Sequence, residues 1–130
     1  MDYVLKDKKT IFIDKKSKIG KNVIIYENNR IEAGCVIDDN VTIFPNCFIS
    51  NTSIGKGAKI YSSVIERSKL GACCSVGPYS IIKRSEIGAF VKVGAFSEIK
   101  NSTLEQGVNA ETGSLIYENQ KRSVHLQTNW

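Results

Sequence analysis

The sequence is poor in the residue types that most catalytic and metal sites need. Its 130 residues include one histidine, one tryptophan, two prolines and four cysteines. The cysteines lack the C-x2-C spacing of a metal site, so we expect no bound metal. We interpret three of them as small buried side chains and expect the fourth, Cys73, to point outward. The other three are Cys35, Cys47 and Cys74.

Long apolar runs are also missing. No stretch approaches the roughly 20 apolar residues of a membrane span, and the N-terminal MDYVLKDKK lacks the apolar region of a secretory signal. We therefore expect no membrane partner and a cytoplasmic location.

The net charge is +5, but no basic helix or aromatic platform is present, which argues against nucleic-acid binding. A basic surface that attracts phosphate-bearing metabolites is the sharper interpretation.

What the sequence contains is a repeat of five or six residues. Nineteen aliphatic or alanine anchors run from Ile13 to Ile116, and five of the eighteen steps between them are five residues long. In the central stretch from Ile54 to Ile99, a small or β-branched residue stands two positions before each anchor. This period fits neither a helix nor a simple strand over long range. It predicts a parallel β-helix in which three short strands form one triangular coil.

The short steps of the repeat are not distributed at random but fall at one corner of the predicted triangular coil. Four of the short steps recur every third step, so they stack at one corner of the prism; they follow Ile49, Ile65, Ile82 and Ile99. A glycine also recurs on one face, after Ile19, Ile54, Leu70 and Ile87. We expect this part of the coil to need a residue with positive φ or a shortened turn, which glycine provides without a Cβ clash.

The pattern predicts a single all-β domain of about six coils. Residues 1–10 are expected to form a cap or a short edge strand, residues 11–117 the β-helix, and residues 118–130 a non-repeating tail. The tail could be a disordered remnant, a cap over the last coil or an arm toward a neighbouring subunit, and its polar composition favours disorder. The only histidine, His125, lies there and is interpreted as solvent-exposed.

Several segments resemble one family. They are KKTIFIDKKSKIGKNVIIYENNRIE (8–32), ISNTSIGKGAKI (49–60), SVIERSKLG (63–71), VGPYSIIKR (76–84) and VKVGAFSEIKNSTL (91–104). This set is similar to the acetyltransferase half of the bacterial bifunctional N-acetylglucosamine-1-phosphate uridyltransferase. The resemblance covers roughly residues 8–117 and implies a left-handed parallel β-helix that assembles as a homotrimer. The Gly-rich phosphate loop of the nucleotide-transfer half does not occur in this sequence.

The resemblance implies a chemistry and a set of residues. That family transfers an acetyl group from acetyl-CoA to the amine of glucosamine-1-phosphate, in UDP-N-acetylglucosamine biosynthesis. By position, Lys100 matches a substrate-binding lysine, and Lys83 stands where the family has a phosphate-binding arginine. A lysine keeps the charge but loses the bidentate geometry, for which Arg84 could compensate. Tyr117 matches a substrate-contacting tyrosine if one residue is inserted.

The sequence departs from the family at the catalytic base. The family has a histidine there, whereas this chain has Thr112 if the register is kept, or Ser114 if one residue is inserted. Neither hydroxyl serves as a base near pH 7 unaided, so no catalytic residue is assigned. The coils that bind acetyl-CoA in the family are not found. An acyltransferase with an incomplete site is one hypothesis; the alternatives are a non-catalytic trimeric β-helix that binds a sugar phosphate or scaffolds a partner, and an enzyme completed by a separate chain.

Overall fold

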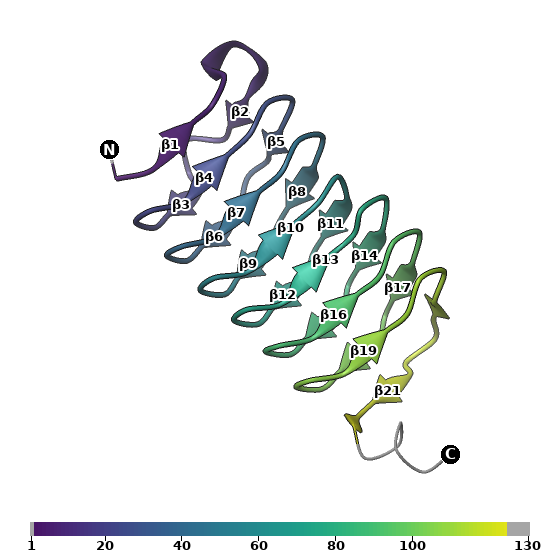
Figure 1. Ribbon diagram of the computed structural model, residues 1–130. Coiled ribbons are helices and arrows are strands. Elements are labelled where there is room, and N and C mark those ends of the chain that lie inside the picture. Colours follow the sequence, from purple (N-terminus) through teal and green to yellow (C-terminus); the bar gives the residue numbers. More distant parts are fainter. Residues whose placement is uncertain (1, 125–130) are drawn as a thin grey trace.

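A computed structural model, which describes residues 2–124, shows a three-sided parallel β-solenoid. The chain turns through one strand of each of three sheets and then begins the next coil, so the coils stack from the N-terminus to the C-terminus (Figure 1). Each sheet is parallel and has seven strands. This architecture confirms the fold class expected from the six-residue repeat. The left hand of the coil stays a prediction.

The strands are two or three residues long and separated by tight turns. The first sheet contains β1 (Val4–Leu5), β4 (Ile24–Ile25), β7 (Thr42–Ile43), β10 (Lys59–Ile60), β13 (Ser75–Val76), β16 (Lys92–Val93) and β19 (Asn109–Ala110). The second contains β2 (Phe12–Ile13), β5 (Arg30–Ile31), β8 (Phe48–Ser50), β11 (Val64–Glu66), β14 (Ile81–Lys83), β17 (Glu98–Lys100) and β20 (Leu115–Ile116). The third contains β3 (Lys18–Ile19), β6 (Val36–Ile37), β9 (Ser53–Ile54), β12 (Lys69–Leu70), β15 (Glu86–Ile87), β18 (Thr103–Leu104) and β21 (Lys121–Arg122). A 3-10 helix, η1 (Lys8–Thr10), follows β1 and is capped by the side chain of Asp7.

The register between strands places the aliphatic anchors of successive coils side by side in each sheet, up to Leu104 in the third sheet. Ile65 pairs with Ile82, which in turn pairs with Ile99, and the other two sheets follow the same rule. Because side chains alternate across a strand, the residues on either side of each anchor point outward. The anchors from Ile25 to Ile116 are at most 5% exposed. The interior is therefore a column dominated by isoleucine, as the repeat predicts.

The small residues two positions before the anchors form hydrogen-bonded ladders inside the column. In the second sheet, the N–H of Ser97 donates to Oγ of Ser80, and the N–H of Ser114 donates to Oγ of Ser97. Ser68, Ser85 and Ser102 make the same chain next to the third sheet. The cysteines Cys35, Cys47 and Cys74 occupy such slots and are buried, whereas Cys73 is exposed. Both expectations for the cysteines are confirmed.

The column has about seven turns, one more than the repeat predicts. The additional pairing comes from its ends, where β1 pairs with β4 and β21 pairs with β18. In β21 the anchor position is held by Arg122, so no aliphatic residue marks that strand in the sequence. Regular pairing thus continues past residue 117. His125 and the rest of the tail lie outside the described residues.

The glycines on the third-sheet side serve a different purpose from the one expected. A Cβ on Gly55 would lie 2.5 Å from the backbone nitrogen of Ala72, and a Cβ on Gly88 would lie 2.7 Å from that of Gln106. Neither glycine has a positive φ. Close approach of the next coil therefore explains them. At the shortened corner positive φ does occur, but asparagine and arginine adopt it, at Asn51, Arg67, Arg84 and Asn101.

Candidate functional site

The outer face of the second sheet brings together three of the four residues expected to bind substrate. Lys83 ends β14 and is the register partner of Lys100, which ends β17. Ile99 pairs with Ile116, so Tyr117, the residue after β20, continues the same row. Neighbouring strands lie about 4.8 Å apart. The three side chains therefore stand in successive layers on one face.

Two carboxylates lie among these cations. The Nζ atom of Lys83 is 3.2 Å from Oε1 of Glu66, and Nζ of Lys100 is 3.8 Å from Oε1 of Glu98. Each of the four side chains is about one-third exposed, between 30% and 36%. The face thus has alternating charge rather than a uniformly positive one.

Tyr117 closes the C-terminal side of this row. Its hydroxyl donates to Oε1 of Glu98, and Nζ of Lys100 lies 5.8 Å from the centroid of its ring. The hydrogen bond to the Glu98 carboxylate raises the pKa of the Tyr117 phenol; burial and the charge of that carboxylate add to the effect. Tyr117, Glu98 and Lys100 consequently form one connected polar cluster.

Arg84 does not join this cluster. It occupies the corner after β14 with a φ of 48°, and its Nε donates to Oδ1 of Asn101 at 2.8 Å. It lines an open cavity of about 480 Å³ that continues onto the outer side of the third sheet. Although Lys83 and Arg84 are adjacent in sequence, the corner between them directs their side chains to different surfaces.

Neither candidate for the missing histidine position is placed as a reactive group. Ser114 belongs to the internal ladder: its N–H donates to Oγ of Ser97 at 3.2 Å, and its hydroxyl donates to the carbonyl of Glu111 at 2.5 Å. Thr112 is exposed in the turn between β19 and β20. Residues 2–124 contain no histidine, and His125 lies beyond them.

Sequence reasoning missed Glu66, Glu98 and Asn101. The signal that could have found them is the length of one coil, because Arg84 and Asn101 are 17 residues apart and stack in adjacent layers. Writing the sequence in rows of one coil places Glu66 above Lys83. The pairing of charges is then visible in the amino-acid sequence itself.

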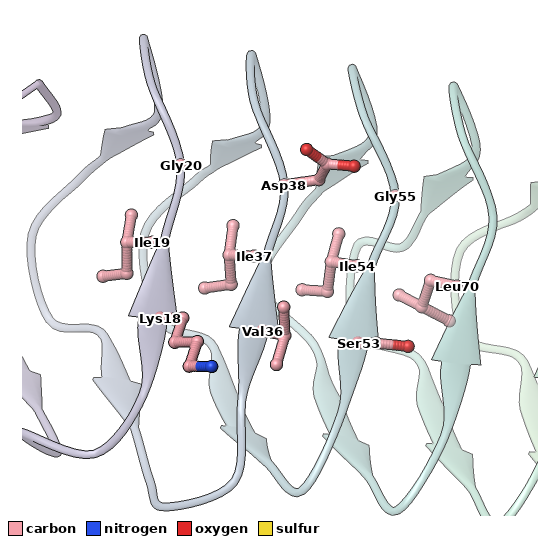
Figure 2. Close-up of a pocket in the computed structure, with 10 residues that line it drawn as sticks. All are labelled: Lys18, Ile19, Gly20, Val36, Ile37, Asp38, Ser53, Ile54, Gly55 and Leu70. Atoms are coloured by element: carbon pink, nitrogen blue, oxygen red, sulfur yellow. The ribbon is translucent and has the colours of Figure 1, made fainter.

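A second open cavity, of about 510 Å³, lies over the N-terminal part of the third sheet. Figure 2 shows Lys18, Val36 and Ser53 on neighbouring strands, with Gly20 and Gly55 near the next corner. The exposed Val36 makes part of the floor apolar. None of the residues expected to bind substrate lines this cavity.

A cluster of metal-binding side chains and a membrane-spanning helix are both missing from the described residues. Residues 2–124 contain no group of three or more histidine, cysteine, aspartate or glutamate side chains arranged to hold a metal ion. Within the same range, no helix is long and apolar enough to cross a membrane. The polar cluster on the second sheet and the two cavities along the third sheet are therefore the surfaces to weigh.

The repeat, the register and the three seven-stranded sheets define the chain as a parallel β-solenoid built from repeats of five or six residues. It is 34% identical over 76 residues to the bifunctional protein GlmU of Synechococcus elongatus, which is 58% of this chain and 17% of the relative. It is 38% identical over 74 residues to the protein of the same name from Clostridium beijerinckii, which is 57% of this chain and 16% of the relative. The chain thus spans about one-sixth of the length of these relatives.

The remaining resemblances are more distant. No protein-family model matches the chain. Among solved structures, the acetyltransferase domain of PglB from Neisseria gonorrhoeae, in complex with acetyl coenzyme A, gives a TM-score of 0.33 at 16% identity, covering 88% of this chain and 50% of that one. A GDP-perosamine N-acetyltransferase from Caulobacter crescentus gives 0.33 at 15% identity, covering 88% and 53%.

Proposed function

We propose that the outer face of the second sheet binds a sugar phosphate, and that the chain is an acyltransferase of the hexapeptide-repeat class. The observation that carries the proposal is the placement of Lys83, Lys100 and Tyr117 in successive layers of one face. Two ammonium groups attract a phosphate, and the aromatic ring offers a flat apolar surface to a sugar. Partial similarity to GlmU supports this class.

The finer proposal follows the resemblance. The acceptor would be glucosamine-1-phosphate and the donor acetyl-CoA. The amine would attack the thioester carbonyl to form an amide, the C–S bond would break, and CoA would leave as the thiol. The phosphate would lie between Lys83 and Lys100, displacing the ion pairs that these residues form with Glu66 and Glu98. The attacking amine must lose a proton.

Binding without acyl transfer is the second candidate, and Ser114 favours it. The position expected to hold the base is occupied by a hydroxyl that donates to the Glu111 carbonyl of the same turn. A hydroxyl in that state cannot take a proton from an ammonium. In this case the solenoid would bind a sugar phosphate or scaffold a partner, with no turnover.

We also propose a homotrimer located in the cytoplasm. Three exposed apolar side chains near the C-terminal half support association: Tyr79 is 63% exposed, Phe96 64% and Leu115 66%. The rings of Tyr79 and Phe96 stack with centroids 5.5 Å apart and form one apolar patch. All four cysteines are free thiols, as in a reducing compartment.

One assay separates the two candidates. The protein is incubated with acetyl-CoA and glucosamine-1-phosphate, and free CoA is quantified by chromatography, because a thiol reagent would also react with the exposed Cys73. Turnover of roughly 1 per second or more, lost in Lys100→Met, is expected of an acyltransferase. No turnover together with saturable binding of the sugar phosphate supports the non-catalytic candidate.

If the protein shows neither turnover nor binding of the sugar phosphate, the proposal as a whole is contradicted. A ligand at about 100 times its Kd should stabilise the fold by about 2.7 kcal/mol. If neither acetyl-CoA nor glucosamine-1-phosphate raises the denaturation midpoint at large excess, the second-sheet face is not a binding site for either compound.

A further inference from the structure

The cavity beside Arg84 is lined by two cations, one carboxylate and several neutral polar side chains. It lies over β15, β18 and β21 and the corner that precedes them, and its volume is about 480 Å³. The residues that line it are polar, and they include two cations; the principal ones are Arg84, Glu86, Asn101, Thr103, Gln120 and Lys121. The lining residues come from three successive coils, so side chains distant in sequence face the same space.

Arg84 is fixed at the rim of this cavity by two hydrogen bonds. Its backbone N–H donates to the carbonyl of Glu66 at 3.0 Å, and its Nε donates to Oδ1 of Asn101 at 2.8 Å. The backbone at Arg84 adopts a left-handed conformation, which is unusual for an arginine. Among residues 2–124 no carboxylate forms an ion pair with it, in contrast to Lys83 and Lys100. The two terminal nitrogens of its guanidinium therefore remain as donors.

The opposite side of the cavity supplies a second cation and further donors. Lys121, in β21, is 69% exposed and lies 3.4 Å from a carboxylate oxygen of Glu105, which is itself 45% exposed. A pair this exposed contributes little and is easily rearranged. The Oε1 atom of Gln120 accepts from Arg122, which leaves the amide nitrogen of Gln120 free to donate.

We propose that this cavity binds a small phosphate monoester that also carries hydroxyl groups, such as a hexose phosphate. The guanidinium of Arg84 would bind two phosphate oxygens, and Lys121 would balance the remaining charge. The side chains of Asn101, Thr103 and Gln120 offer partners for hydroxyl groups. The site lies on a different surface from the second-sheet face, so variants at Arg84 and at Lys100 distinguish binding at the two places.

The experiment is calorimetric titration with three probes: inorganic phosphate, glucose-1-phosphate and glucose. Glucose-1-phosphate is expected to bind more tightly than inorganic phosphate, and glucose is expected not to bind. Arg84→Asn should lower the affinity for glucose-1-phosphate by about tenfold or more, since hydrogen bonds between charged groups are lost. The variant should fold, because Asn51 and Asn101 occupy the same corner position in other coils with φ of 46° and 51°.

A matched control is available at the same corner. Arg67 adopts a φ of 49° one coil earlier and does not line the cavity, so Arg67→Asn should change affinity less than about twofold. Equal losses in the two variants would show non-specific attraction by surface charge and would overturn the site. Loss of binding in Lys100→Met with retention in Arg84→Asn would place the anion on the second-sheet face instead. Absence of glucose-1-phosphate binding to the unmodified protein would also refute the proposed site beside Arg84.

Discussion

Lys83 and Lys100 are register partners on adjacent strands, yet each forms its ion pair with a different carboxylate. Lys83 pairs with Glu66 of the preceding coil, and Lys100 pairs with Glu98 on its own strand. Two like charges in neighbouring layers would repel each other, and the carboxylates relieve that repulsion. A ligand phosphate on this face must therefore compete with internal partners for the same cations.

This competition predicts that removing a carboxylate improves anion binding. In Glu66→Gln, Lys83 loses its partner, and the affinity for glucosamine-1-phosphate should rise roughly fivefold at low salt, which corresponds to about 1 kcal/mol. Stability should change by less than about 1 kcal/mol, because the pair is partly exposed. Titration calorimetry at low and physiological salt measures both the gain and its screening.

The matched control lies on the same sheet. Glu32 forms an ion pair with Arg30 in the N-terminal coils, away from the proposed site. Glu32→Gln should leave the affinity unchanged within error. An equal gain in Glu32→Gln would mean that net charge alone controls binding, and the lysine row would lose its special role.

Two glycines should respond to alanine for different reasons. In Gly55→Ala the new Cβ would lie 2.5 Å from the backbone nitrogen of Ala72, and backbone cannot move aside without separating two coils. We expect a loss of about 3 kcal/mol in the free energy of unfolding. Gly113 has open space around it but a φ of 78°, so Gly113→Ala should cost about 1 kcal/mol. Urea denaturation measures both.

An asparagine at position 113 provides the check on this explanation. Asparagine tolerates the left-handed region, so Gly113→Asn should recover most of the stability lost in Gly113→Ala. Gly55→Asn should be no better than Gly55→Ala, because its problem is space rather than φ. A rescue at position 55 would show that close approach of the coils is not the constraint.

Tyr117 should titrate above the ordinary pKa of a tyrosine. Its hydrogen bond to Glu98 raises its pKa above the ordinary value of 10.0. Because the folded-state pKa is the higher one, the stabilisation is fully present below about pH 10 and is lost as the pH rises through the folded-state pKa. Ultraviolet titration of phenolate should show one late component that disappears in Tyr117→Phe. In Glu98→Gln that component should shift to lower pH; an unchanged curve would mean that the hydrogen bond is not formed in solution.

The interior of this fold could be predicted from the sequence, but the conformation of its corners could not. Anchors such as Ile65 and Ile82 repeat with the coil, so their burial and stacking follow from spacing alone. The corner residues Arg84 and Phe96 adopt positive φ, although their side chains give no hint of it. The sequence therefore placed Lys83 and Arg84 in one site, whereas a corner of the chain separates them. The pair of Lys83 and Glu66 is different: once successive coils are aligned, Glu66 lies beside Lys83, so the spacing of the repeat could have predicted it.

The cysteines provide a prediction that tests burial along the column. Cys47 and Cys74 lie in inward slots, where burial raises their pKa to about 11 and about 12. Burial also raises the pKa of Cys35, so none of these three thiols should react at pH 8, because the thiolate is the reactive form. Cys73 is exposed in a turn with a φ of 58°.

Alkylation with iodoacetamide at pH 8 should therefore modify one thiol per native chain and four in denaturant. Mass spectrometry should locate the native adduct on Cys73, and Cys73→Ser should abolish native labelling without changing the denatured count by more than that one residue. Labelling of Cys47 in the native protein, at a rate like that of Cys73, would contradict the inward slot and with it the register that stacks the coils. The buried slots thus connect a chemical reactivity that is simple to measure with the spacing from which the fold was first inferred.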